Sequence, residues 1–187
     1  MRTLHVIDIE NILGGPFADS SLFNESKNIY QSITEIQNED HVLIASNPEL
    51  FLPTLTSWAY DQDSDEWSGD ITSSDLFSKY SNLTIGENLE IFVRPGKDGA
   101  DRILNEKAVE LLNDYDHIVI ASGDHYFLNL CNKALSLGKT IEIISTQHGL
   151  SNQLKRIPCQ KTTFEFNSQD STRNGVFQWT SKVGAMV

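Results

Sequence analysis

Residues 118–124 read IVIASGD, a run of apolar and mostly β-branched residues that ends in Ser-Gly-Asp. Two other apolar runs also end in aspartate or lead to one: residues 5–8, HVID, and residues 90–93, EIFV, which precede Asp98 and Asp101. Apolar runs with little alternation are typical of strands that are covered on both faces of a parallel sheet. If the three runs belong to one sheet, their carboxylates gather at its carboxyl edge.

Segments with a helical spacing of apolar residues separate the strands. Residues 100–112 and 126–135 each place apolar side chains on one helical face, and Gly138 is predicted to cap the second of these helices. A crossover helix is predicted around residues 29–36. A further helix is predicted near Asn47-Pro48, because this pair is typical of a helix start.

The strands and helices alternate along the chain, which indicates right-handed crossovers between parallel strands. The predicted fold class is therefore α/β, a three-layer sandwich with a mostly parallel central sheet. Its strands are predicted at residues 4–9, 42–45, 90–93, 118–121, 141–144 and, at an edge, 162–166.

The length of 187 residues suits one domain with a single core. Residues 1–166 are predicted to form this domain, with an acidic, serine-rich surface loop near residues 61–81. Residues 167–187 are predicted to be a polar C-terminal tail without regular structure. The two cysteines, Cys131 and Cys159, lack the spacing of a zinc site or a disulfide framework.

The formal net charge of −12 argues against an extended basic surface that neutralises many phosphates. It does not exclude a small catalytic cleft, because bound cations cancel charge at a cluster of carboxylates. Much of the charge also lies in the acidic loop.

No apolar run approaches the roughly 20 residues that a helix needs to cross a bilayer. The chain begins with Met1-Arg2-Thr3-Leu4, which leads into a predicted strand rather than a signal peptide. We therefore expect a cytoplasmic protein without a membrane segment.

Acidic residues follow several of the predicted strands, at the edge where open α/β sheets bind ligands. Carboxylate oxygens of this kind suit Mg²⁺ or Mn²⁺, so the pattern favours metal-dependent phosphodiester chemistry. The candidate residues are Asp8, Glu10, Asn11, Asp98, Asp101 and Asp124.

A structural role is an alternative for three of these aspartates. Asp98 and Asp124 can cap the helices that follow them, and Asp101 can stabilise the first turn of its helix. Asp8 differs because it ends an apolar strand with no evident helix to cap, and a buried charge is costly without a partner.

Three segments resemble, in order and spacing, the acidic motifs of NYN-type domains in the PIN-like nuclease superfamily: residues 6–11, VIDIEN, residues 99–104, GADRIL, and residues 121–124, ASGD. The resemblance spans roughly residues 3–166. It implies a PIN-like fold and a ribonuclease dependent on Mg²⁺ or Mn²⁺. In this resemblance, Asp8, Asp101 and Asp124 hold the metal and Asn11 orients the site.

The chain departs from the family pattern at Tyr126, where many relatives carry a further acidic residue. Three explanations stay open. Glu10 or Asp98 supplies the missing carboxylate, one metal suffices, or the domain has lost catalysis and only binds.

Basic side chains near the motifs are candidates for contacts with RNA phosphates, since cations stabilise the charge on a phosphoryl group under attack. They are Arg94, Lys97, Arg102 and His125. The sequence thus predicts a metal-dependent endoribonuclease, or alternatively a catalytically inactive NYN-like module that binds RNA or a protein partner. A phosphatase with Asp8 as nucleophile is less favoured, because Glu10 stands where a second aspartate is usual. Whether the chain forms a homo-oligomer is left open.

Overall fold

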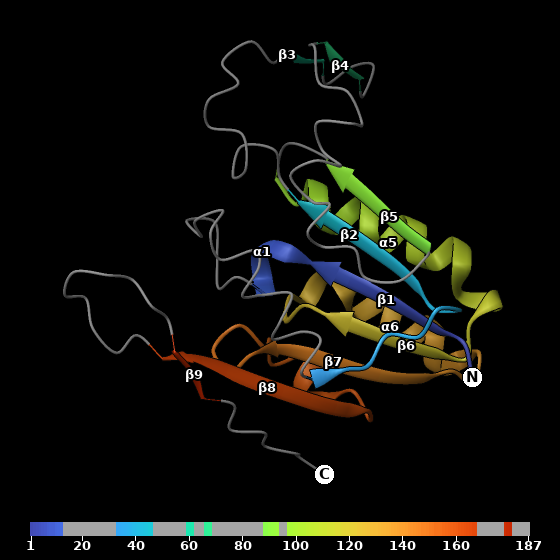
Figure 1. Ribbon diagram of the computed structural model, residues 1–187, viewed down its shortest axis with the longest axis vertical. Helices are drawn as coiled ribbons and strands as arrows, with labels where there is room; N and C mark the ends of the chain where they lie inside the picture. The colour runs from blue at the N-terminus through green and yellow to red at the C-terminus, as the bar shows by residue number, and fades with distance from the viewer. Residues whose placement is uncertain are drawn as a thin grey trace.

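The computed structural model describes residues 1–12, 33–46, 59–61, 66–68, 88–93, 97–167 and 178–180. Within these residues, seven strands form one sheet in the order β5-β2-β1-β6-β7-β8-β9 (Figure 1). All neighbouring pairs are parallel except β8 with β9, which is antiparallel. The strands are β1 (Thr3–Asp8), β2 (His41–Ser46), β5 (Asn88–Val93), β6 (His117–Ala121), β7 (Thr140–Thr146), β8 (Gln160–Asn167) and β9 (Gln178–Thr180).

Helices and short turns connect the strands. The longer helices are α5 (Gly99–Leu111) and α6 (Leu128–Ser136), and a single helical turn, α1 (Ile9–Ile12), follows β1. Short 3-10 helices are η2 (Leu112–Asp114), η3 (His125–Phe127) and η4 (Leu154–Arg156). A separate antiparallel pair consists of β3 (Ala59–Asp61) and β4 (Glu66–Ser68).

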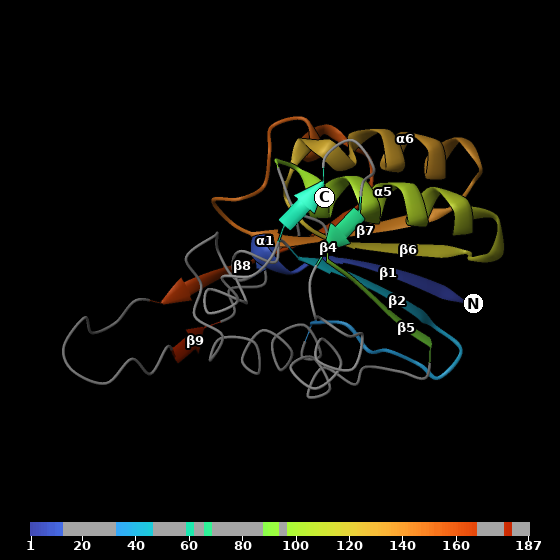
Figure 2. The ribbon, with the colours of Figure 1, turned by 90° about the horizontal axis from the view of Figure 1, so that it is seen from above.

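The predicted α/β class with a mostly parallel sheet is confirmed. Helices α5 and α6 lie side by side on one face of the sheet (Figure 2). Gly138 has a φ of 72° and follows α6, as expected of a C-cap glycine, because other residues are strained in this left-handed region.

The structure corrects several local predictions. Ile9 belongs to α1 rather than to the first strand. We expected β8 at the edge of the sheet, but β9 pairs with its end. Strand β9 lies in the segment that we expected to be an irregular tail. Part of the predicted acidic loop forms β4. Within the predicted crossover helix, Ile33 is helical and residues 34–36 are not, while residues 29–32 lie outside the described residues, as does the helix near Asn47-Pro48.

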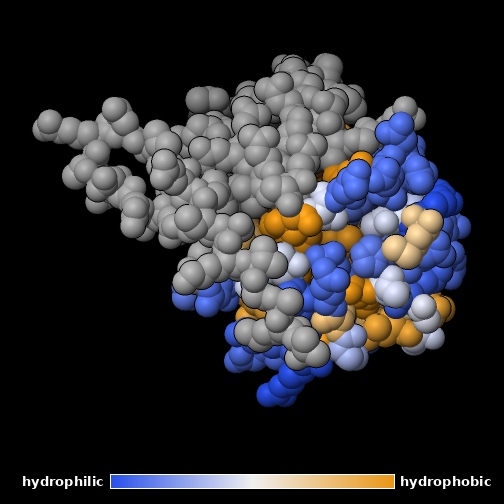
Figure 3. Space-filling model, turned by 60° about the horizontal axis from the view of Figure 1, so that its bottom comes forward, coloured by the Kyte–Doolittle hydropathy of each residue, from blue (hydrophilic) through white to orange (hydrophobic). Residues whose placement is uncertain are grey.

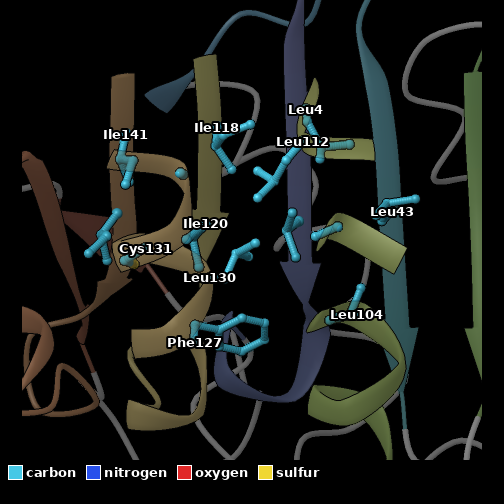
Figure 4. Packing of buried hydrophobic residues seen from close by; sticks show 14 of the residues in the cluster. Leu4, Leu43, Leu104, Leu112, Ile118, Ile120, Phe127, Leu130, Cys131 and Ile141 are labelled. Carbon is cyan, nitrogen blue, oxygen red and sulfur yellow. The ribbon is translucent and has the colours of Figure 1, made fainter. Parts of the chain in front are cut away.

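The core between the sheet and the helices contains alternate residues of each central strand. Leu4 and Val6 of β1 and Ile118 and Ile120 of β6 pack against side chains of α5 and α6, as Figure 4 shows in part. The intervening residues on the opposite face are also buried, among them Ile7, Val42, Ile44, Val119 and Ile144. Burial on both faces explains why these strands read as continuous apolar runs.

The register between β1 and β6 brings two of the predicted motifs together. Ile7 pairs with Ala121, so Asp8 and Ser122 follow at the same level of the sheet. In Figure 4, Leu104 of α5 and Phe127 of η3 lie toward the carboxyl ends of the strands, and Leu112 lies toward the amino ends. The first turns of both helical segments therefore lie at the carboxyl edge.

The surface offers few large exposed apolar side chains. Among the described residues these are Met1 and Leu137, and on the face in Figure 3 hydrophobic residues are interspersed with hydrophilic ones. Within the same residues, no helix has both the length and the apolar character needed to span a membrane.

Candidate active site

Asp8 ends β1 with a buried carboxylate, which is only 6% exposed. Its Oδ1 accepts a hydrogen bond from the Asn11 N–H at 3.3 Å, and its Oδ2 accepts one from Ser122 Oγ at 3.0 Å. Burying a carboxylate is costly unless its oxygens have donors. Both oxygens of Asp8 have one, so the orientation of the carboxylate is defined.

The expectation that Asp8 has no helix to cap was wrong. Asp8 directly precedes α1, and Asn11 is the third residue of that helix. A side-chain oxygen that accepts from the third N–H is the usual N-cap interaction. Capping therefore explains part of the conformation of Asp8, and burial rather than the lack of a helix distinguishes it from the other candidate aspartates.

Ser122 links the ends of β1 and β6. Its side chain is fully buried, and its Oγ donates to Asp8 Oδ2 while it accepts from the Asp124 N–H at 3.2 Å. Sequence analysis did not single out Ser122. The available signal was its position, directly after an apolar strand and two residues before a candidate aspartate.

Asn11 connects the same two strand ends. Its Oδ1 accepts a hydrogen bond of 2.9 Å from the Gly123 N–H. The link orders the segment that carries Asp124, and it is consistent with the orienting role that the family resemblance implies for Asn11.

Gly123 allows the loop after β7 to approach this junction. A Cβ at Gly123 would overlap Ser145 Oγ and the Gly149 carbonyl group, so no larger residue fits without a shift. The Gly123 carbonyl oxygen also accepts a hydrogen bond of 2.8 Å from the Ser151 N–H. The ends of β1 and β6 and the loop after β7 are therefore packed as one unit.

Asp124 caps η3, as the structural alternative anticipated. Its Oδ1 accepts from the Tyr126 N–H at 2.7 Å and lies 3.0 Å from Nδ1 of His125. The side chain is 39% exposed. Both contacts are made through one oxygen, Oδ1, of a carboxylate that solvent reaches.

Asp98 and Asp101 lie at the start of α5. Asp98 occupies the N-cap position with a φ of 57°, but its side chain makes no capping hydrogen bond, and its carbonyl oxygen accepts from the Arg102 N–H. Capping by the Asp98 side chain is thus not observed. Asp101 lies in the first turn, half-buried, where a negative charge favours the helix. Helix α5 contacts η3, which follows Asp124.

Three of the four predicted basic residues are described, and all three are on the surface. Lys97 and Arg102 are exposed near the start of α5, and His125 is exposed beside Asp124. Arg94 and the side chain of Glu10 lie outside the described part of the structure.

Tyr126 replaces the acidic residue of many relatives. It is half-buried in η3, and its ring packs edge-on against Phe127, with 6.5 Å between ring centroids. The neighbouring Phe127 is fully buried in the core. Tyr126 therefore packs beside the buried Phe127 and supplies no carboxylate at this position.

The donor chemistry of the site suits a divalent cation, since aspartate oxygens and an amide are hard ligands. Among the residues that the structure describes, however, no three His, Cys, Asp or Glu side chains are grouped as a metal site. Ser122 joins the Asp8 carboxylate to the backbone N–H of Asp124.

These features define a class of protein: an α/β domain with a largely parallel sheet and acidic residues at the carboxyl ends of its central strands. The chain belongs to the NYN domain family, which matches residues 7–164. This domain is part of the PIN-like nuclease superfamily, so the chain has a nuclease-type fold, and the resemblance seen in the sequence is confirmed.

One solved structure supports the fold, and two others match with lower scores. A protein of unknown function from Vibrio parahaemolyticus is similar over 87% of this chain and 91% of its own, with a TM-score of 0.51 and 12% sequence identity. A pyrazinamidase/nicotinamidase from Streptococcus mutans, with a TM-score of 0.34, and a nicotinamidase from Staphylococcus aureus, with 0.33, are each 16% identical to this chain. The match to the Streptococcus mutans protein covers 82% of this chain and 88% of that protein. The match to the Staphylococcus aureus protein covers 80% of this chain and 82% of that protein. No curated protein matches the chain.

Proposed function

We propose that this protein is a metal-dependent ribonuclease that hydrolyses phosphodiester bonds in RNA. The observation that carries the proposal is the buried carboxylate of Asp8, held on both oxygens beside the Ser122 to Asp124 segment of an NYN domain. A buried carboxylate that donors hold at the carboxyl end of a parallel strand is suited to act as a metal ligand.

Asp8, Asp101 and Asp124 are the residues proposed to hold Mg²⁺ or Mn²⁺, with Asp98 and Glu10 as further donors. When bound, such a metal supplies an activated water and neutralises charge on the attacked phosphate. The remaining contributions come from the chain itself.

Three contacts prepare the site. Ser122 and the Asn11 N–H orient the Asp8 carboxylate. Asn11 Oδ1 holds Gly123 and thereby the backbone that carries Asp124. Asp124 uses Oδ1 for its capping contact, which leaves Oδ2 for a ligand.

The substrate proposal rests on family and charge. RNA is the substrate that an NYN domain suggests, and we propose that Arg94, Lys97, Arg102 and His125 contact its phosphates. A cytoplasmic location, and a homo-oligomer or a protein partner, stay predictions of the sequence.

A second candidate function is an inactive module that binds RNA or a protein. Two observations favour it: the described acidic side chains do not form a group of three, and Tyr126 replaces a carboxylate. The two candidates differ in one measurable property, namely turnover in the presence of a divalent metal.

The first prediction concerns Asp8. Purified protein is incubated with end-labelled single-stranded RNA and Mg²⁺ or Mn²⁺, and the products are separated on a denaturing gel. We expect cleavage that a chelator abolishes, and we expect Asp8→Asn to slow it by about a hundredfold or more, since an electrostatic element of the site is lost.

Asp114→Asn is the matched control, because Asp114 is exposed in η2, away from the carboxyl edge, and loses the same charge. Asp124→Asn provides a second test at a partly exposed position if Asp8→Asn folds poorly. Wild-type cleavage by both site variants contradicts the proposal. RNA binding without turnover under any metal condition favours the binding module instead.

A further inference from the structure

The two segments that contain the longer described helices, α5 and α6, differ in charge. Residues 97–116, which include α5, carry six acidic and three basic residues, a formal net charge of −3. Residues 125–164, which include α6 and η4, carry five lysine or arginine residues and one acidic residue, a formal net charge of +4. That acidic residue, Glu142, is buried, so it contributes little to the surface. The chain as a whole carries −12, so the basic region is a local exception.

Within this region, η4 lies next to the candidate site. Ser151 donates its N–H to the Gly123 carbonyl oxygen at 2.8 Å, and its own carbonyl oxygen accepts from the Lys155 N–H at 3.0 Å. Two backbone hydrogen bonds therefore connect Gly123, the neighbour of Asp124, with Lys155.

The η4 turn is anchored so that its basic side chains face outward. Leu154 is fully buried and Ile157 is 7% exposed, and both belong to the core cluster. Between them, Lys155 and Arg156 are exposed. Because the flanking residues are fixed in the core, the two cations are held at the surface at low entropic cost.

We propose that Lys155 and Arg156 form a phosphate-binding patch that receives the RNA backbone beside the Asp8 and Asp124 edge. This inference rests on the proposed function, because it assigns the path of that substrate. RNA fits the patch because its phosphates are attracted to the basic region. The basic residues predicted from the sequence lie near α5 and at His125, and none of them is in η4.

The test measures binding apart from cleavage. Binding of fluorescein-labelled single-stranded RNA is followed by fluorescence anisotropy in a chelator, over a series of salt concentrations. For Lys155→Ala combined with Arg156→Ala, we expect affinity about tenfold weaker at about 0.1 M salt. The slope of log affinity against log salt is expected to fall by about 1.4, since each phosphate contact on a single strand contributes about 0.7.

Lys107→Ala combined with Lys139→Ala is the matched control. It removes the same charge from α5 and from the segment between α6 and β7, and Lys139 there bonds to the Asn113 carbonyl oxygen at 3.4 Å. Unchanged affinity in the η4 double variant, an equal loss in the control, or no RNA binding by the wild type overturns the inference. The inference is also overturned if polyglutamate displaces the labelled RNA as well as unlabelled RNA of the same charge does, because that result indicates a surface for an acidic protein. If RNA binds through Lys155 and Arg156 but is not cleaved, the proposed nuclease activity is contradicted while the phosphate-binding patch is supported.

Discussion

Asp8 and Ser122 show how single residues prepare the candidate site. A carboxylate that is 6% exposed is stable only with donors on its oxygens, and Ser122 provides one of them. Ser122 also accepts from the Asp124 N–H, so one hydroxyl group serves two strand ends. Loss of that hydroxyl removes a donor from the buried Asp8 carboxylate and an acceptor from the part-buried Asp124 N–H.

Ser122→Ala is therefore expected to reduce the free energy of unfolding by about 1 to 3 kcal/mol, the usual cost of leaving a buried polar group unsatisfied. Urea denaturation checks this. Ser136→Ala is the control, because Ser136 is exposed on α6 and its hydroxyl bonds only to the carbonyl oxygen of Lys133 in the same helix. Equal midpoints for Ser122→Ala and wild type would show that the bridge contributes nothing to stability.

At the scale of elements, the junction between β6 and the β7 to β8 connection holds the site together. Gly123 has Ser145 Oγ and the Gly149 carbonyl group in the space that a Cβ would occupy. The Ser151 N–H donates across the same junction. Backbone contact this close requires glycine, and it brings η4 beside Asp124.

Gly123→Ala is expected to destabilise the protein by about 1 to 3 kcal/mol, because backbone rather than a flexible side chain must move. It should also speed hydrogen exchange at the Ser151 amide, which loses its acceptor geometry. Gly138→Ala is the comparison. Gly138 has a φ of 72° and open space around it, so strain arises there without a clash. If Gly138→Ala speeds exchange at Ser151 as much as Gly123→Ala does, the local explanation is wrong.

At the scale of the whole molecule, stability depends on a buried histidine on the sheet face opposite α5 and α6. His5 is fully buried, 3.5 Å from Asp40, which is 2% exposed and also accepts from the N–H groups of Thr3 and Gln37. Burial lowers the pKa of His5 from 6.5 to about 4, although Asp40 opposes the shift. The neutral imidazole is therefore the form that the folded protein prefers.

The sign follows from proton binding. The unfolded chain binds a proton at His5 below pH 6.5, whereas the folded protein does so only near pH 4. The contribution of neutral His5 to the free energy of unfolding is therefore complete above pH 6.5 and falls as the pH drops toward 4. The total is about 3 kcal/mol. Urea denaturation at several pH values should show a shallower decline for His5→Gln than for wild type. Identical declines for His5→Gln and wild type would contradict the assignment.

Local patterns predicted most of the elements because their causes are short-range. Burial of both faces produces the apolar runs of β1 and β6, and the helical spacing of residues 100–112 corresponds to α5 within one residue at each end. The Gly138 cap also depends only on its neighbours in sequence. Strand β9 and the one-turn helix α1 were missed because three or four residues carry too little periodicity to detect.

The sequence by itself determined the alternation of strands and helices, the family and the acidic residues at strand ends. Only the tertiary structure decided which of those residues meet. Ser122 and Asp8 are 114 residues apart and Gly123 and Asn11 are 112 apart, and their contacts exist because β1 and β6 are neighbours in the sheet. The basic turn η4 joins the same edge through Gly123. Strand order and register are set by packing of the whole core, and no local spacing in the chain encodes them.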